Sequence, residues 1–104
     1  MPKIAIFAKL TAQPGKGDEM MAVLQKLADA VQQEEGTEIY AAHRPVGDPD
    51  SVWFYELYRD QDAFAAHGSS DAMREFGPQF GALLGAPPEI SMTELVTGKG
   101  VTPS

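Results

Sequence analysis

The sequence of 104 residues contains no cysteine. Disulfide bonds, thiolate nucleophiles and cysteine-based metal or iron–sulfur sites are therefore excluded. Long apolar runs are also missing, since no stretch approaches the ~20 apolar residues that a membrane helix needs. The first residues, Met-Pro-Lys-Ile-Ala-Ile, contain neither the apolar segment nor the cleavage site of a signal peptide. We therefore expect a cytoplasmic protein that does not enter a membrane.

Basic residues are scarce. Lysine and arginine together number 8 against 15 acidic residues, so the formal net charge is −7. A surface of this sign repels phosphate backbones and anionic lipid headgroups. Nucleic acid and membrane surfaces are therefore not expected as partners.

Histidine is nearly as scarce, with only His43 and His67 in the chain. They belong to separate predicted elements and show no spacing typical of metal ligands, so no metal site is expected. The turn at residues 14–17 lacks the spacing of a phosphate-binding loop, and no nucleophile elbow is present.

The periodicity of apolar residues predicts four strands and three helices. The first helix is expected over residues 18–35, capped by Asp18, with its apolar stripe at Met20, Leu24, Leu27 and Val31. A short helix, capped by Asp60, ends at Gly68, and a further helix then begins at Ser69 or Ser70. The strands are expected over residues 3–11, 37–46, 52–59 and 89–97.

This order predicts an α+β fold of the ferredoxin-like β-α-β-β-α-β type, an antiparallel sheet with its helices on one face. We expect a single domain over residues 1–98 and a flexible tail over residues 99–104.

The face of the sheet that the helices do not cover would be open. Depending on the register, that face carries residues such as Ile4, Ile6, Tyr40, Phe54 and Leu95. An apolar open face of this size predicts a homodimer that packs sheet against sheet.

Several short segments, in this order, resemble the antibiotic biosynthesis monooxygenase domain, in its quinol monooxygenase-like branch of dimeric α+β barrels. They are the strand that runs into Pro14-Gly15-Lys16-Gly17, Glu35-Gly36-Thr37 followed by Tyr40, Asp48-Pro49-Asp50 before the strand with Glu56, and Asp60 leading to Ala63-Phe64-Ala65-Ala66-His67 and Ser69-Ser70. The resemblance covers residues 3–96.

The resemblance implies a homodimeric monooxygenase that needs no cofactor and oxidises a small aromatic substrate, a quinol or polycyclic phenol, with O₂. Related families include heme-degrading enzymes, whose pocket contains asparagine, tryptophan and histidine. This chain has no asparagine, and its only tryptophan, Trp53, lies on a predicted strand, so heme degradation is not expected. Two alternatives are a protein that binds or isomerises a small carbonyl metabolite and a non-catalytic dimer module.

His67 is the candidate catalytic residue. A neutral imidazole can remove a phenolic proton at physiological pH, and the substrate anion can then pass an electron to O₂. The protein would supply the base, orientation and a dry apolar pocket. The other interpretation is a structural histidine that caps the short helix or bonds a backbone carbonyl.

Six further residues are the expected substrate-binding set: Phe54, Glu56, Tyr58, Phe64, Phe76 and Phe80. Glu56 could orient His67 or bind a substrate hydroxyl, but pairing with Lys9 or Arg44 across strands is the favoured interpretation. Strand alternation allows two pocket-facing sets, either Val52, Phe54, Glu56 and Tyr58 or Trp53, Tyr55, Leu57 and Arg59. Glu56 favours the first set, which leaves Trp53 as an interface anchor.

Overall fold

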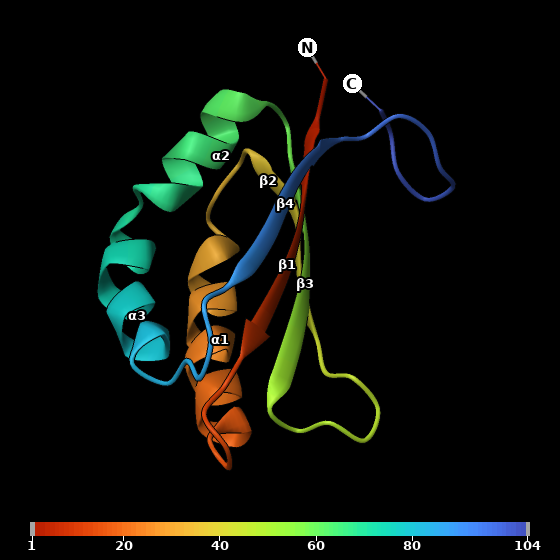
Figure 1. The fold of residues 1–104 in the computed structure, drawn as a ribbon. Coiled ribbons are helices and arrows are strands. Elements are labelled where there is room, and N and C mark those ends of the chain that lie inside the picture. Colours follow the sequence, from red (N-terminus) through yellow and green to blue (C-terminus); the bar gives the residue numbers. More distant parts are fainter. Residues whose placement is uncertain (1, 104) are drawn as a thin grey trace.

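The computed structural model describes residues 2–103 and contains one four-stranded antiparallel sheet with three helices on one of its faces (Figure 1). In chain order the elements are β1 (Ile4–Thr11), α1 (Gly17–Val31), β2 (Thr37–His43), β3 (Ser51–Tyr58), α2 (Gln61–Gly68), α3 (Asp71–Gly81) and β4 (Glu89–Glu94). The strand order is β2-β3-β1-β4, so β2 and β4 are the edges. This confirms the predicted ferredoxin-like fold.

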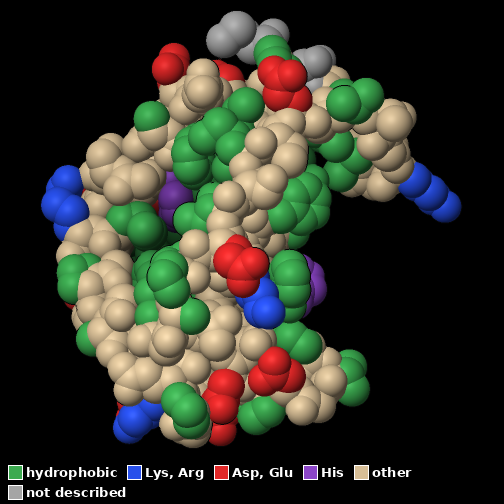
Figure 2. Space-filling view, viewed as in Figure 1, with side chains coloured by type: hydrophobic (Ala, Val, Ile, Leu, Met, Phe, Trp, Pro, Cys, Tyr) green, Lys and Arg blue, Asp and Glu red, His purple; other side chains and the backbone are tan. Residues whose placement is uncertain are grey.

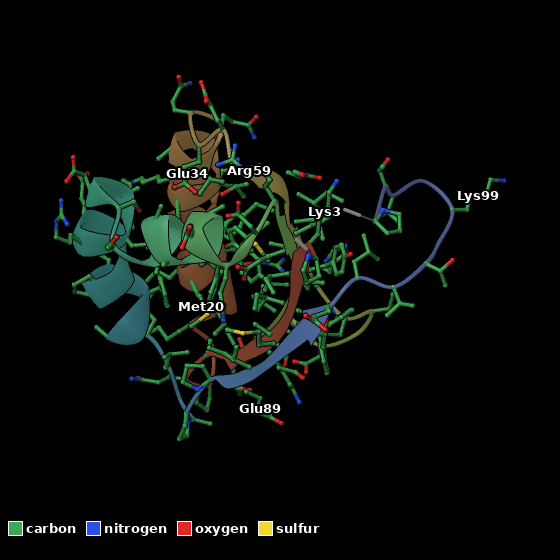
Figure 3. All side chains as sticks on the ribbon, turned by 90° about the horizontal axis from the view of Figure 1, so that it is seen from above. Lys3, Met20, Glu34, Arg59, Glu89 and Lys99 are labelled. Atoms are coloured by element: carbon green, nitrogen blue, oxygen red, sulfur yellow. The ribbon has the colours of Figure 1, made fainter. Side chains whose placement is uncertain are left out.

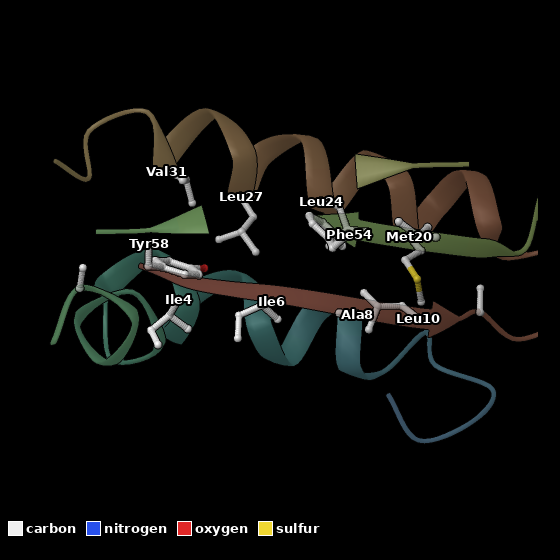
Figure 4. Packing of buried hydrophobic residues seen from close by; sticks show 13 residues of the cluster. Ile4, Ile6, Ala8, Leu10, Met20, Leu24, Leu27, Val31, Phe54 and Tyr58 are labelled. Atoms are coloured by element: carbon white, nitrogen blue, oxygen red, sulfur yellow. The ribbon is translucent and has the colours of Figure 1, made fainter. Parts of the chain in front are cut away.

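The core lies between α1 and the two central strands (Figure 4). The stripe of Met20, Leu24, Leu27 and Val31 is buried, as its helical spacing predicts. It packs against the alternate residues of β1 and β3 that face the helices, namely Ile4, Ile6, Ala8, Leu10, Val52, Phe54 and Tyr58. Each strand therefore buries one side against the helices, as the period of two requires.

The start of α1 differs from the prediction. The helix begins at Gly17, so Asp18 lies in its first turn and forms an ion pair with Arg44 at 3.1 Å instead of capping the helix. The capping carboxylate is that of Asp50, in the β2–β3 connection, which accepts hydrogen bonds from the backbone N–H groups of Gly15 at 3.1 Å and Gly17 at 3.0 Å. A residue distant in sequence thus satisfies the free N–H groups of this helix end.

Three predicted ends are too long by more than one residue. The helix α1 stops at Val31, before Glu34 and Glu35, whose charges are unfavourable at the negative end of a helix. The strand β2 stops at His43, because Pro45 has no N–H group to continue the ladder. The strand β4 stops at Glu94, which pairs with the first residue of β1.

The caps of the two shorter helices agree with the prediction. Asp60 accepts a hydrogen bond from the N–H of Ala63 at 2.8 Å, and Ser70 accepts one from the N–H of Met73 at 3.2 Å. No helix within residues 2–103 is long and apolar enough to cross a membrane. The predicted domain start at Met1 and tail end at Ser104 lie outside the described residues, and the flexibility of the tail stays a prediction.

The face of the sheet away from the helices carries Trp53, as expected, but lacks four of the apolar residues that were expected there. Ile4, Ile6, Tyr40 and Phe54 all lie on the helix-facing side. Ile4 pairs with Tyr58, Phe54 pairs with Ala8, and both Ile6 and Tyr40 pair with Glu56, so all four share the face that carries these residues. The open face instead presents Phe7 and Trp53, each about half exposed at 49% and 48%. The Phe7 ring packs on Tyr55, and the Lys9 ammonium lies 5.5 Å from the centre of the Trp53 ring.

Candidate functional site

The strand β3 brings two polar side chains into the space beneath the helices. Glu56 and Tyr58 are two residues apart and therefore share the helix-facing side with Phe54. Both side chains are buried, and the Tyr58 hydroxyl donates a hydrogen bond of 2.5 Å to Glu56 Oε1. A carboxyl group is thereby held in a fixed orientation within a mostly apolar layer.

The helix α2 places His67 beside this pair. The Asp60 cap sets the start of the helix, and His67 lies almost two turns later with only 5% of its surface exposed. Its ring centre is 5.5 Å from that of Tyr58 and 5.1 Å from that of Tyr40. One ring nitrogen, Nδ1, lies 2.9 Å from Glu34 Oε1. No partner for the other nitrogen, Nε2, is found within residues 2–103.

Glu34 reaches His67 because α1 ends early and its exit turn packs closely on α2. A Cβ atom at Gly36 would lie 2.5 Å from the Cβ of Ala63, so only glycine permits this approach. The same Oε1 atom of Glu34 accepts a second hydrogen bond, of 2.7 Å, from the Thr37 hydroxyl. The Thr37 hydroxyl and His67 Nδ1 therefore meet at one carboxylate oxygen, at the end of the molecule where Glu34 and Arg59 are labelled in Figure 3.

A cavity of about 260 Å³ separates the helices from the sheet at this point. It opens between the helices and β4, where Figure 2 shows a hollow with a histidine side chain inside it. Its lining is Ile6, Ala8, Leu10, Leu24, Tyr40, Phe54, Glu56, Phe64, His67, Gly68, Met73, Phe80, Pro88 and Ile90. The only acidic or imidazole side chains in this lining are Glu56 and His67, so the cavity is apolar with one polar end.

The buried position perturbs the acidity of the groups at that end. Burial raises the pKa of the Glu56 carboxyl, although the hydrogen bond from Tyr58 and the nearby His67 ring act in the opposite direction. Burial also raises the pKa of the Tyr40 hydroxyl, with further contributions from Glu56 and Glu34. The pKa of Tyr58 is raised by burial and by Glu56. Both phenols therefore remain protonated donors at neutral pH, and Glu56 holds a proton more readily than an exposed glutamate.

Most of the predicted site residues meet in this cavity. Phe54, Glu56, Phe64, His67 and Phe80 line it. Tyr58 lies behind Glu56 and contributes through its hydrogen bond. Phe76 is absent from the lining and packs on the core from outside.

The favoured pairing of Glu56 with Lys9 or Arg44 is wrong. Lys9 lies on the open face over Trp53, and Arg44 pairs with Asp18, whereas Glu56 points toward the helices. The alternative that His67 bonds a backbone carbonyl is also wrong, because the partner of its Nδ1 is the Glu34 side chain.

Two polar residues of the site, Tyr40 and Glu34, were missed in the sequence. Tyr40 lies directly opposite Glu56 in the β2–β3 register, and correct alignment of these strands would have placed its ring in the cavity. Glu34 has no comparable signal, because the sequence suggests only one of two charged residues in the last turn of the predicted first helix. Its role depends on where α1 ends and on the contact at Gly36.

Within residues 2–103 no three acidic or histidine side chains are grouped as metal ligands would be.

Comparison with known proteins identifies relatives over nearly the whole chain. A sequence profile described as antibiotic biosynthesis monooxygenase matches residues 3–79. One relative, YcnE of Bacillus subtilis (strain 168), carries a provisional name as a monooxygenase. It is 27% identical over 92 residues, which covers 88% of this chain and 97% of YcnE.

Solved structures show the same fold. A protein from Caulobacter crescentus CB15, provisionally assigned as an antibiotic biosynthesis monooxygenase, is 29% identical with a TM-score of 0.87, and the match covers 92% of each chain. A conserved protein from Methanosarcina mazei Go1 is 26% identical with a TM-score of 0.83, covering 89% of this chain and 92% of the other.

Proposed function

Because the chain belongs to the antibiotic biosynthesis monooxygenase family, we propose that it oxidises a quinol or related phenol with O₂ and needs no cofactor, with His67 as the base. The observation that carries this proposal is the pairing of a buried imidazole with an apolar cavity. The free Nε2 of His67 belongs to a side chain that lines the cavity, so a substrate hydroxyl bound there can reach a base in apolar surroundings.

The reaction balances without an added reductant. His67 Nε2 takes the proton of one substrate hydroxyl, and the anion passes one electron to O₂. The resulting superoxide and substrate radical combine to form a carbon–oxygen bond. The peroxide receives the proton from His67, its O–O bond breaks, and the ring carbon loses its hydrogen as it becomes a carbonyl. One oxygen atom remains in a hydroxyquinone and the other leaves as water.

The other polar groups of the cavity support the same assignment. Glu56, whose pKa is raised by burial, can hydrogen-bond the second hydroxyl of a quinol. Tyr40 and Phe54, whose ring centres are 4.9 Å apart, and Phe64 provide aromatic faces against a planar substrate. No lysine or arginine lines the cavity in residues 2–103, which disfavours a phosphorylated carbonyl metabolite.

The cavity volume limits the substrate. A cavity of ~150 Å³ in another protein binds benzene, so about 260 Å³ suits one ring or two fused rings with their hydroxyl groups. The smaller members of the expected class are therefore favoured over phenols of three or four rings.

Oxygen uptake tests the proposal. The protein is mixed with a panel of one-ring and two-ring quinols in chelator-treated buffer, with spontaneous oxidation measured separately. We expect enzyme-dependent uptake that falls ~10²- to 10⁴-fold in His67→Ala, the usual contribution of a positioned base. Uptake that is equal in the two proteins would exclude His67 as the base. The absence of uptake with every quinol would refute the proposed activity.

We also propose that the protein is a homodimer joined through the open face of the sheet. Phe7 and Trp53 are each about half exposed there, and Tyr55 packs beside Phe7. Aromatic residues of this kind are typical anchors of interfaces. Analytical ultracentrifugation at micromolar concentration should give the mass of a dimer, and Trp53→Asp should shift it toward the monomer. A monomeric wild-type protein would contradict the proposal. The cytoplasmic location and the absence of nucleic-acid partners stay predictions.

A further inference from the structure

The His67 ring separates two hollows. On one side is the apolar cavity, and on the other is an outer hollow of about 370 Å³, whose lining includes Glu34, Thr37, Arg59, Ala66 and His67. Glu34 lines only the outer hollow and keeps 20% of its side chain exposed, whereas 5% of the His67 side chain is exposed. The carboxylate is thus the more exposed partner, while the ring that it contacts lines the apolar cavity.

The hydrogen bonds around Glu34 determine which nitrogen of His67 carries the proton. Glu34 Oε1 already accepts from the Thr37 hydroxyl at 2.7 Å, and His67 Nδ1 is 2.9 Å away. With a proton on Nε2 alone, lone pairs of Nδ1 and Oε1 would face each other at this distance. A neutral ring therefore donates from Nδ1–H and leaves Nε2 unprotonated.

We infer that Glu34 is the positioning residue of His67: its carboxylate, held by Thr37, fixes the Nδ1–H tautomer so that Nε2 is the base that faces the cavity. The catalytic part of this inference rests on the proposed function. When Nε2 gains a proton, the ring becomes an imidazolium ion next to a carboxylate, which stabilises that charge. The other ionisable groups near the ring are Glu56, Tyr58 and Tyr40 on the cavity side and Glu35, Arg59 and Asp62 around the outer hollow. None of them bonds Nδ1, whose partner is Glu34.

The tautomer can be measured without any substrate. His43 also bonds through Nδ1, to the Trp53 carbonyl, so the experiment uses a His43→Gln background in which His67 is the only histidine. Nitrogen-15 NMR, at a pH where titration shows the ring to be neutral, should give Nδ1–H and a bare Nε2. In Glu34→Ala we expect a mixture of tautomers, and in Glu34→Gln, whose amide oxygen can still accept, mostly Nδ1–H.

Kinetics give the second readout. Glu34→Ala should lower kcat for quinol oxidation by about 10- to 100-fold, the range seen when the outer partner of a metal-bound histidine is removed. KM should change little, because Glu34 does not line the cavity. Formate added to Glu34→Ala should restore part of the rate by entering the outer hollow, and Glu34→Gln should lie between Ala and wild type. The matched control is Glu35→Ala, next in sequence and without a hydrogen bond to His67, which should match wild type.

The possible failures are distinct. A wild-type spectrum with the proton on Nε2, or a Glu34→Ala variant with unchanged tautomer or unchanged kcat, would overturn the inference. If Glu34→Ala does not fold, kcat of Glu34→Gln decides, because loss of the charge must lower kcat even though the Nδ1–H tautomer is kept; an unchanged kcat in this variant would overturn the inference. A wild-type protein that consumes no oxygen with any quinol would refute the proposed function, while the NMR result would still decide whether Glu34 sets the tautomer.

Discussion

The close approach of Gly36 to Ala63 predicts that a larger side chain at position 36 would disturb both the fold and the site. An alanine there would place its Cβ 2.5 Å from the Cβ of Ala63, whereas carbon atoms in contact normally lie ~3.5–4.0 Å apart. The turn after α1 must then move away from α2 by roughly 1 Å. Ala63 is a short side chain with no rotamer to give way, so the backbone must shift. Overpacking of this kind costs about 1–3 kcal/mol of stability.

The same shift reaches the site, because Glu34 lies on one side of this contact and His67 on the other. Their hydrogen bond is 2.9 Å long, and a separation larger by ~1 Å exceeds the usual limit of about 3.2 Å. Gly36→Ala should therefore also lose the Nδ1–H preference of His67 and resemble Glu34→Ala in kcat.

A matched substitution in α3 separates this steric effect from a general effect of removing glycine. Nothing lies within 4 Å of a Cβ at Gly81, the last residue of the helix, so Gly81→Ala should stabilise the protein by ~0.4–1 kcal/mol. Thermal unfolding of both variants measures the difference, at about 4–8 °C per kcal/mol for a small domain. A melting temperature of Gly36→Ala at or above wild type would refute the close approach of the turn and α2.

Two further predictions concern polar groups. Burial raises the pKa of the Glu56 carboxyl in the folded protein above its ordinary value of 4.5. Ionisation of this carboxyl therefore opposes folding. The protein loses stability as the pH rises from 4.5 through the pKa of Glu56 in the folded state. Glu56→Gln, which can still accept from Tyr58, should gain stability over wild type with rising pH, by ~1.4 kcal/mol per pKa unit of the shift; a pH-independent difference in urea titrations would contradict this. Asp50→Ala should destabilise the protein by about 1–2 kcal/mol in the same assay, because the N–H groups of Gly15 and Gly17 lose their acceptor, and an unchanged midpoint would show that Asp50 does not cap α1.

The parts of the fold that repeat a simple period could be predicted from the sequence. The α1 stripe from Met20 to Val31 and the alternation along β3 both follow from burial of one face. The alternation left two possible helix-facing sets on β3, and the choice of the set with Glu56 came from the family resemblance. Asp60 could also be recognised as a cap, because its hydrogen bond to Ala63 is local.

Features that depend on contacts distant in sequence could not be predicted. Asp50 caps a helix that begins more than thirty positions earlier, and only the folded β2–β3 connection brings it there. Glu34 reaches His67 across 33 positions, through a turn whose path depends on a glycine contact with α2. Phe76 shares the helical stripe of Phe80, yet only Phe80 lines the cavity, since the placement of α3 decides which ring reaches it.

In the proposed reaction, His67 in the apolar cavity starts the transfer of one oxygen atom from O₂ to a quinol. The most direct test is turnover of a two-ring quinol under ¹⁸O₂, with the product analysed by mass spectrometry before its carbonyl groups exchange with water. We predict a hydroxyquinone with one labelled oxygen atom from the wild-type protein, and only the spontaneous background from His67→Ala. An unlabelled quinone product, or equal labelled product from both proteins, would contradict the account.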